Sequence, residues 1–373
     1  MSHYRLSSSE LDNLARESDM LCNHGLKEGS MKAMKRTRPL ALVILLLLVF
    51  VWTGEIRGQS IVDGAKKEGK VVFYSSLTIQ EIDQIAVPFT KKYPFIKVEP
   101  FRGNSEQLLQ KITLEERAGR PQHDVAQFNA FEEWQLQKLG LLQRYKSPEA
   151  KNYPDIYKDP EGYWTVIYAN YLVLGYNPKQ VKEEELPKKW EDLLLPKWKG
   201  DKFAMDRNEG VWYGGLSFAW GRERADKFIK ALALQDPSIR KGHTLIATLL
   251  SSGEFPLGLV YAHRVEEMKA KGASIDWLSL DPIIVTPNII AMGKNTAHPN
   301  AAKLLIDFCL SKEGQTILQQ QQFRTPASPD IPPTSPKMDP KKLKLFLADK
   351  RVADQYDRFA KEYYELFVKG KPE

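Results

Sequence analysis

The sequence predicts an α/β fold built as two lobes, and three observations support this prediction. From residue 69 onward, short apolar segments alternate with segments of helical spacing, which favours parallel strands connected by helices. The chain has 373 residues, enough for two domains or lobes. One β-rich run, residues 163–178, is longer than an ordinary strand and could cross from one lobe to the other.

The N-terminus predicts an exported protein. A basic segment from Met31 precedes the apolar run LALVILLLLVFVW, and small residues follow, an order typical of a secretory signal peptide. The run is shorter than the roughly 20 apolar residues that span a bilayer, although an uncleaved anchor is an alternative. A signal peptide should begin its chain, so we expect the true start at Met31 or Met34. We therefore assign 1–58 to a doubtful leader plus a cleaved signal peptide, and the rest to the periplasm.

Composition limits the class of partner. The net charge is +7, but the lysines are scattered rather than clustered, so no nucleic-acid partner is expected. Cys22 lies in the leader and Cys309 in an apolar helical stretch, so the mature chain has no disulfide framework. No cysteine directly follows the apolar run, which argues against a lipid anchor. A soluble monomer is the simplest expectation.

The first lobe is predicted from three strands, each followed by a helix. The expected strands are 69–77, 96–103 and 123–129, and the expected helices are 78–94, 104–119 and 131–142. In open parallel sheets, ligands bind beyond the carboxyl ends of the strands. Those ends here carry Ser75 and Ser76, Arg102 and Asn129.

The second half of the chain is predicted to continue the pattern after the long run. Its expected elements are a helix near 189–198, a strand at 202–206, helices at 210–221 and 224–235, a turn and helix at 239–253, a strand and helix from 254, two short β segments around Pro287, a helix pair at 297–321, a Pro-rich linker and a last helix. The strand from 254 ends in Tyr261, His263 and Arg264. These groups either are solvated at a helix start or face a site.

Enzyme motifs are not found in the sequence. There is no GxGxxG, no GxxxxGK[ST] loop, no GxSxG and no HExxH. Adjacent glutamates such as Glu132-Glu133 fall in helical charged runs and point in different directions, so we interpret them as solvated faces. Together with the export signal, this favours binding over catalysis, with no cofactor.

Three segments resemble one family. EDLLLPKWKGD, LLSSGEFPLGLVYAHR and NTAHPNAAKLLIDFCLSKEGQTIL are similar to extracellular solute-binding proteins of ABC importers, in the ferric-ion-binding-like branch with the type II periplasmic-binding-protein fold. The resemblance spans about Gly69 to Gln320. It implies two mixed sheets flanked by helices, crossing hinge strands, closure on a ligand and a membrane permease as partner. The implied division is 59–168 for the first part of lobe 1, 169–283 for lobe 2, 284–325 for the return to lobe 1, and 326–373 for a Pro-rich linker and a helix packing on lobe 2.

The resemblance alone would suggest iron as the ligand. Ferric-binding relatives commonly carry two adjacent tyrosines after the second-lobe strand, and those positions fall on His263 and Arg264 here. Tyr261 comes two residues earlier, and a family glutamate falls near Asn129. Since arginine would repel a metal cation, we expect no metal site, with Tyr261 and His263 as the alternative ligands if iron binds.

The residues instead predict a site for a small organic anion. Arg264 and Arg102 can hold a carboxylate, phosphonate or sulfonate by paired hydrogen bonds. Helix starts add positive dipole ends, and Trp212 and Tyr213 could wall an organic body. The predicted ligand-binding residues are Ser75, Ser76, Arg102, Ser105, Asn129, Tyr168, Asn170, Arg207, Asn208, His243, Thr244, Tyr261, His263 and Arg264.

Structural alternatives stand beside these roles. Arg102 could only pair with Glu106, Asn208 could only cap a helix, and Arg264 could only pair with Glu267 on its own helix face. The leading hypothesis is a periplasmic receptor that delivers an organic anion to an ABC permease. A ferric-ion receptor is the first alternative and a secreted enzyme on the same fold is the second.

Overall fold

The computed structural model describes residues 60–370. The predicted leader and signal peptide, with Met31, Met34 and Cys22, lie outside the described residues. From Ile61 onward the chain forms one compact unit. No helix within residues 60–370 is both long and apolar enough to cross a membrane.

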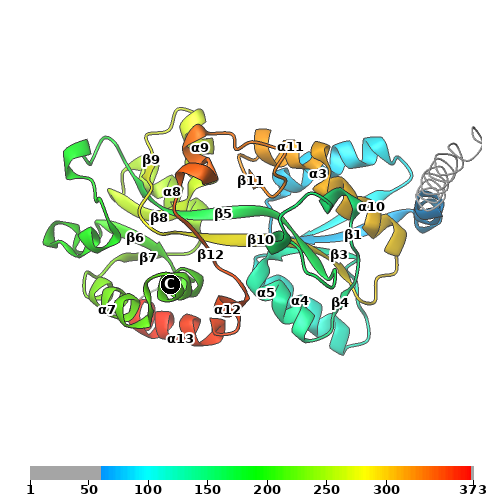
Figure 1. The fold of residues 1–373 in the computed structure, drawn as a ribbon, viewed down its shortest axis with the longest axis horizontal. Helices are drawn as coiled ribbons and strands as arrows, with labels where there is room; N and C mark the ends of the chain where they lie inside the picture. Colours follow the sequence, from blue (N-terminus) through cyan, green and yellow to red (C-terminus); the bar gives the residue numbers. More distant parts are fainter. Residues whose placement is uncertain (1–59, 371–373) are drawn as a thin grey trace, which may run out of the picture. The chain divides into compact units, whose positions relative to one another are not determined.

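Lobe 1 is an α/β layer of parallel strands (Figure 1). Strand β1 pairs in parallel with both β2 and β3. The elements of lobe 1 are β1 (Lys70–Ser75), α3 (Ile79–Lys92), β2 (Lys97–Arg102), α4 (Ser105–Arg117), β3 (Val125–Asn129), α5 (Ala130–Lys138), α10 (Pro299–Leu310) and α11 (Lys312–Gln320). Capping boxes fix two helix starts, because Thr78 and Asn104 each exchange hydrogen bonds with the residue three positions later.

Lobe 2 repeats this design with a second set of parallel strands. Strand β6 pairs in parallel with β7 and β8. The elements of lobe 2 are β6 (Phe203–Asp206), α6 (Gly210–Trp220), α7 (Arg222–Ala233), β7 (Ser238–Arg240), α8 (His243–Ser252), β8 (Leu257–Tyr261), α9 (Ala262–Ala270) and α13 (Tyr356–Phe367). Helix α13 packs on α6, and the Tyr363 hydroxyl donates to the Asp206 carbonyl at 2.6 Å.

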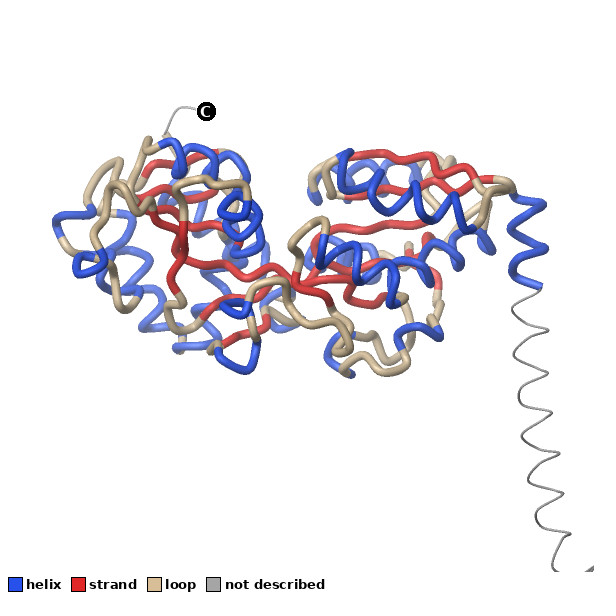
Figure 2. Tube along the Cα trace, turned by 90° about the horizontal axis from the view of Figure 1, so that it is seen from above, coloured by secondary structure: helices blue, strands red, loops and turns tan. Residues whose placement is uncertain are grey.

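Two long antiparallel strands, β5 (Trp164–Tyr176) and β10 (Ile283–Gly293), join the lobes. The strands are hydrogen-bonded in the order β2-β1-β3-β10-β5-β8-β6-β7. The two mixed sheets that the sequence predicted are therefore the two ends of one continuous sheet. Figure 2 shows the strands passing between the two groups of elements. The two-lobed α/β fold with crossing strands is therefore confirmed. The proposed lobe borders fall within β5 and at the start of β10.

Strand β10 corrects the expectation of two short β segments around Pro287. The strand is continuous through Pro287. On one edge it pairs first with β12 (Leu345–Leu347) and then with β3, and Pro287 lies in the gap between these two pairings. Its missing N–H therefore interrupts no pairing on that edge. The helix expected near 189–198 is also wrong, because two 3₁₀ turns, Trp190–Leu194 and Pro196–Trp198, take its place. Pro196, which starts the second turn, cannot continue a helix from the first.

The remaining elements are short and lie along the crossing strands or the C-terminal segment. They are β4 (Leu142–Gln143), β9 (Asp276–Leu278), β11 (Thr325–Pro326) and α12 (Lys350–Ala353). Strands β9 and β11 pair with β5, and β4 pairs with β10. The crossing strands thus organise segments that lie far apart in the sequence.

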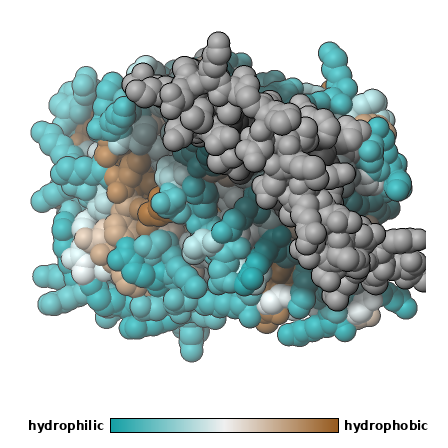
Figure 3. Space-filling view, turned by 45° about the vertical axis from the view of Figure 1, so that its right-hand side comes forward, coloured by the Kyte–Doolittle hydropathy of each residue, from teal (hydrophilic) through white to brown (hydrophobic). Residues whose placement is uncertain are grey.

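The core lies between the sheet and its helices. Trp212 and Tyr213, expected to wall an organic ligand, are buried in this core, and Trp212 packs edge-on against Trp190 with ring centroids 5.2 Å apart. They correct the expectation because α6 turns this face toward its neighbouring helices rather than toward the cleft. In Figure 3, the described surface is mostly hydrophilic with smaller apolar areas.

Candidate functional site

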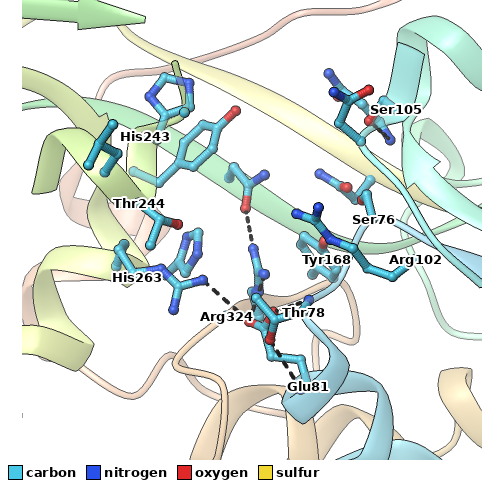
Figure 4. Close-up of a pocket in the computed structure, with 18 of the residues that line it drawn as sticks. Ser76, Thr78, Glu81, Arg102, Ser105, Tyr168, His243, Thr244, His263 and Arg324 are labelled. Carbon is cyan, nitrogen blue, oxygen red and sulfur yellow. Dashed lines mark hydrogen bonds and ion pairs between the residues drawn. The ribbon is translucent and has the colours of Figure 1, made fainter. Parts of the chain in front are cut away.

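A cavity of about 450 Å³ lies between the two lobes at the carboxyl ends of the strands. Lobe 1 contributes the ends of β1, β2 and β3 with the starts of α3 and α4, and lobe 2 contributes the starts of α8 and α9. The lining residues are Ser76, Thr78, Glu81, Arg102, Asn104, Ser105, Asn129, Tyr168, Asn170, Lys241, Gly242, His243, Thr244, Leu245, Tyr261, His263, Arg264, Asn288 and Arg324. Figure 4 shows how these side chains converge from both lobes.

Most of the residues predicted from the sequence come together in this cavity. They are Ser76, Arg102, Ser105, Asn129, Tyr168, Asn170, His243, Thr244, Tyr261, His263 and Arg264. Strand ends meet at one edge of a sheet, so polar residues that are remote in sequence converge there. Their part in ligand binding stays a prediction.

Three predicted residues lie outside the cavity lining. Ser75 is fully buried on the other face of β1, where its hydroxyl donates to Gln127 Oε1 at 2.6 Å, because successive strand residues face opposite sides. Arg207 and Asn208 follow β6 without lining the cavity. The helix-cap alternative for Asn208 is also not observed, since α6 has Glu209 at its cap position and no side-chain cap bond.

Sequence reasoning missed several lining residues. They are Thr78, Glu81, Asn104, Lys241, Gly242, Leu245, Asn288 and Arg324. Thr78 and Glu81 form a capping box, a sequence pattern that predicts a helix start but not a binding site. Arg324 has no local signal: it enters the cavity because β11, directly after it, pairs with β5.

Three rings from lobe 2 form one wall of the cavity. The ring centroids of His243 and Tyr261 are 4.0 Å apart, and those of Tyr261 and His263 are 5.7 Å apart. Burial lowers the pKa of His243, and burial with nearby guanidinium charges lowers the pKa of His263 well below its usual value. Burial and the charge of Glu209 raise the pKa of Tyr261. The wall therefore presents neutral imidazoles and a protonated phenol at neutral pH.

A network of two arginines around one carboxylate forms another wall. Arg324 Nη2 lies 2.8 Å from Glu81 Oε1, and Arg264 Nη2 lies 3.5 Å from the same oxygen. Burial alone would raise the pKa of Glu81. The charges of Arg324 and Arg264, with hydrogen bonds from Thr78, outweigh burial and lower this pKa to about 2. Glu81 is therefore ionised at any physiological pH.

The arginine alternatives from the sequence have different outcomes. Arg264 does pair with Glu267 on its own helix, while its other terminal nitrogen reaches Glu81 across the lobes. Within residues 60–370, Arg102 forms no ion pair with Glu106, whose carboxylate accepts instead from Gln110. Within residues 60–370, neither Arg102 nor Lys241 has an ion-pair or hydrogen-bond partner, and both are exposed. Two cations thus reach the cavity unpaired.

Among residues 60–370, no three His, Cys, Asp or Glu side chains are arranged to hold a metal ion. Tyr261 and His263, the alternative metal pair, both line the cavity, so any metal there would have to use phenolate and imidazole with ligands from elsewhere.

The two-lobed fold with a polar cleft defines a class of periplasmic-type ligand-binding proteins. The chain belongs to the family of bacterial extracellular solute-binding proteins, whose model matches residues 123–351. The resemblance inferred from the sequence is confirmed. Members of this class bind a small solute and deliver it to an ABC permease.

Known relatives and solved structures agree with this family. The chain is 27% identical to an uncharacterized protein of Haemophilus influenzae, covering 78% of this chain and 88% of that protein. It is 25% identical to iron uptake protein A1 of Synechocystis, covering 75% and 81%. The structure of AfuA from Actinobacillus pleuropneumoniae with fructose-6-phosphate bound matches with a TM-score of 0.71 and 25% identity, covering 81% of this chain and 99% of that one. One of these proteins is thus named for iron uptake, and another was solved with a sugar phosphate bound.

Proposed function

We propose that this protein is the periplasmic receptor of an ABC importer for a small organic anion. The observation that carries the proposal is the charge of the cavity. Of the described side chains that line it, four are cationic (Arg102, Lys241, Arg264 and Arg324) and one, Glu81, is a carboxylate. A cleft with this excess of positive charge attracts anions and repels metal cations.

The other lining groups support an organic, hydrogen-bonding ligand. Hydroxyl and amide side chains surround the cations, among them Ser76, Ser105, Asn170 and Asn288. Helix α8 begins at His243 in the cavity wall, and within residues 60–370 no side chain caps it. The preceding Gly242 N–H donates to the Asp206 carboxylate, so only the N–H groups that follow it are open to an anion. The likeness to AfuA, which holds a phosphorylated sugar, agrees with this chemistry. Carboxylate, phosphonate, sulfonate and phosphate-ester ligands all fall within the class.

A ferric-ion receptor is the second candidate. Tyr261 and His263 line the cavity, and one relative is the Fe(3+)-binding periplasmic protein of Serratia marcescens. Two features weigh against iron: guanidinium groups of Arg264 and Arg324 lie in the same cavity, and burial raises the pKa of Tyr261, which opposes a phenolate.

We further propose that the protein is exported by a cleaved signal peptide and acts as a receptor rather than as an enzyme. The apolar run at 40–52 supports export. The family, whose members bind and deliver solutes, supports the receptor role. Turnover of any bound ligand would contradict it.

Thermal unfolding with a ligand panel tests the function. The panel contains citrate, an alkylphosphonate, a sulfonate, fructose 6-phosphate and ferric citrate. A specific ligand at about 100 times its Kd should stabilise the protein by ~2.7 kcal/mol. Arg102→Gln should weaken the response, whereas Arg117→Gln, an exposed arginine outside the cavity, should not. A red-purple iron–phenolate colour with no response to iron-free anions would establish the iron receptor instead.

A further inference from the structure

The four cationic side chains that line the cavity differ in how many ion pairs and hydrogen bonds they make within the protein. Arg324 is buried and engaged on several sides. Its Nη2 contacts Glu81 at 2.8 Å, its Nη1 donates to Asn170 Oδ1 at 3.2 Å, and its guanidinium carbon lies 4.5 Å from the centroid of the Tyr168 ring. These contacts use two of the five guanidinium N–H donors, and Nε has no hydrogen-bond partner within residues 60–370, so the protein chiefly satisfies the charge of Arg324.

Arg264 is likewise occupied, and by two carboxylates. Nη1 pairs with Glu267 on the same helix, and Nη2 lies 3.5 Å from Glu81 on the opposite lobe. Figure 4 shows Arg324 beside Glu81, with dashed lines for the interactions around this carboxylate. The carboxylate of Glu81 thus stands where the anionic group of a ligand would otherwise be held.

The position of Glu81 is fixed by the start of helix α3. Its Oε2 accepts the Thr78 N–H at 2.8 Å, and the Thr78 hydroxyl accepts the Glu81 N–H, so the capping box determines where the carboxylate lies. Glu81 is only 6% exposed, and its partners come from both lobes. A carboxylate in this position is a permanent part of the site.

Arg102 and Lys241 are in the opposite situation. Arg102 ends β2 in lobe 1, and Lys241 precedes α8 in lobe 2, so each lobe brings one of them to the cavity. Across the described part of the chain, neither has an ion-pair partner. The start of α8, which no described side chain caps, follows Lys241, and the Gly242 N–H between them donates to the Asp206 carboxylate.

We infer that Glu81 is a built-in counter-ion shared by Arg324 and Arg264, and that Arg102 and Lys241 select the anionic group of the ligand. This inference rests on the proposed function. It moves the anion from Arg264, the residue that the sequence favours, to the two unpaired cations. It also predicts one anionic group per ligand, because the second pair of cations is already occupied, with hydroxyl-bearing parts of the ligand facing Asn170 and Asn288.

Inorganic sulfate tests the role of Glu81 without any natural ligand. In Glu81→Gln, the amide can still serve the capping box, but the two arginines lose their counter-ion. Sulfate affinity, measured by calorimetry, should rise about tenfold or more over wild type, as expected when an anion gains charge-assisted bonds. Glu267→Gln is the matched control, because it removes a carboxylate from Arg264 outside the cavity, and should change sulfate affinity less than about threefold. No gain in Glu81→Gln, or an equal gain in both variants, would overturn the inference.

Fructose 6-phosphate tests the roles of the free cations. Arg102→Gln and Lys241→Gln, both at exposed positions where folding is not at risk, should each weaken binding by about tenfold or more, and Arg264→Gln by less than about threefold. A larger loss in Arg264→Gln than in the other two would overturn the assignment. If wild type binds no member of the anion panel, the proposed function fails and this assignment fails with it, while the sulfate comparison still decides whether Glu81 neutralises the arginines.

Discussion

The sharpest prediction for stability concerns Glu132, a carboxylate buried at the start of α5. Glu132 is 7% exposed, and its Oε2 has no hydrogen-bond partner within residues 60–370. Tyr356, at the start of α13, lies close by and packs against Phe131 with ring centroids 5.9 Å apart. Burial raises the pKa of Glu132 to about 7, and the charge of Glu106 adds to the shift. The substitution to examine is Glu132→Gln.

The size and sign of the effect follow from proton linkage. The pKa is 4.5 in the unfolded chain and about 7 in the native state, so the native state holds a proton that the unfolded state releases between these values. The free energy of unfolding of wild type therefore falls as pH rises through this window, by about 3 kcal/mol from Glu132 alone. Glutamine has no proton to lose, so the variant should lack this part of the decrease.

Urea unfolding at pH 5 and pH 8 measures the effect. Wild type should lose about 2.5 kcal/mol more stability than Glu132→Gln between pH 5 and pH 8. Glu184→Gln, at an exposed position in a 3₁₀ turn, is the control and should show the wild-type dependence. An identical pH dependence in wild type and Glu132→Gln would refute the reasoning, because it would mean that this carboxylate is already ionised in the native state.

Three further predictions concern the framework of the site. The Asp124 carboxylate accepts from the His298 ring at 2.8 Å and from three other donors. Asp124→Ala should therefore lower the free energy of unfolding by about 3–5 kcal/mol, as measured by urea unfolding. Gly210→Ala should lower stability by about 1–3 kcal/mol, since its Cβ would lie 2.8 Å from Ala360 Cα; an unchanged Tm would show that α13 yields freely. The Cys309 thiol is buried, which raises its pKa to about 12, so a thiol reagent should modify it only after urea unfolds the protein, and rapid native labelling would contradict this burial.

Much of the site was predictable because strand ends carry their own signals. Arg102, Asn129 and Tyr261 each fall where an apolar strand gives way to polar residues, and all three line the cavity. The uncertainty about which residues after β8 face inward is resolved by the turn from strand to helix. Tyr261 ends the strand, and His263 and Arg264 lie on the first turn of α9, so all three line the cavity.

The sequence alone could not predict how these charges are balanced. Glu81 appears locally as the third residue of a helix cap, and Glu132 as part of a charged helical run that was expected to be solvated. That expectation is wrong, because α5 buries Glu132 and Glu133 at its first turn, where neighbouring segments cover them. Burial is set by packing between segments distant in the sequence, and no local pattern records it.

By itself, the sequence determined the fold class, the family and the edge of the sheet at which the cavity lies, because periodicity and strand ends are local properties. Only the tertiary structure decided which cations remain free. Arg324 reaches the cavity through the pairing of β11 with β5, and Arg264 meets Glu81 only because helices from different lobes approach each other there. The interaction between two charges depends on their distance in space, not in sequence. Glu81, which pairs with the buried Arg324, lies 243 positions before it in the chain.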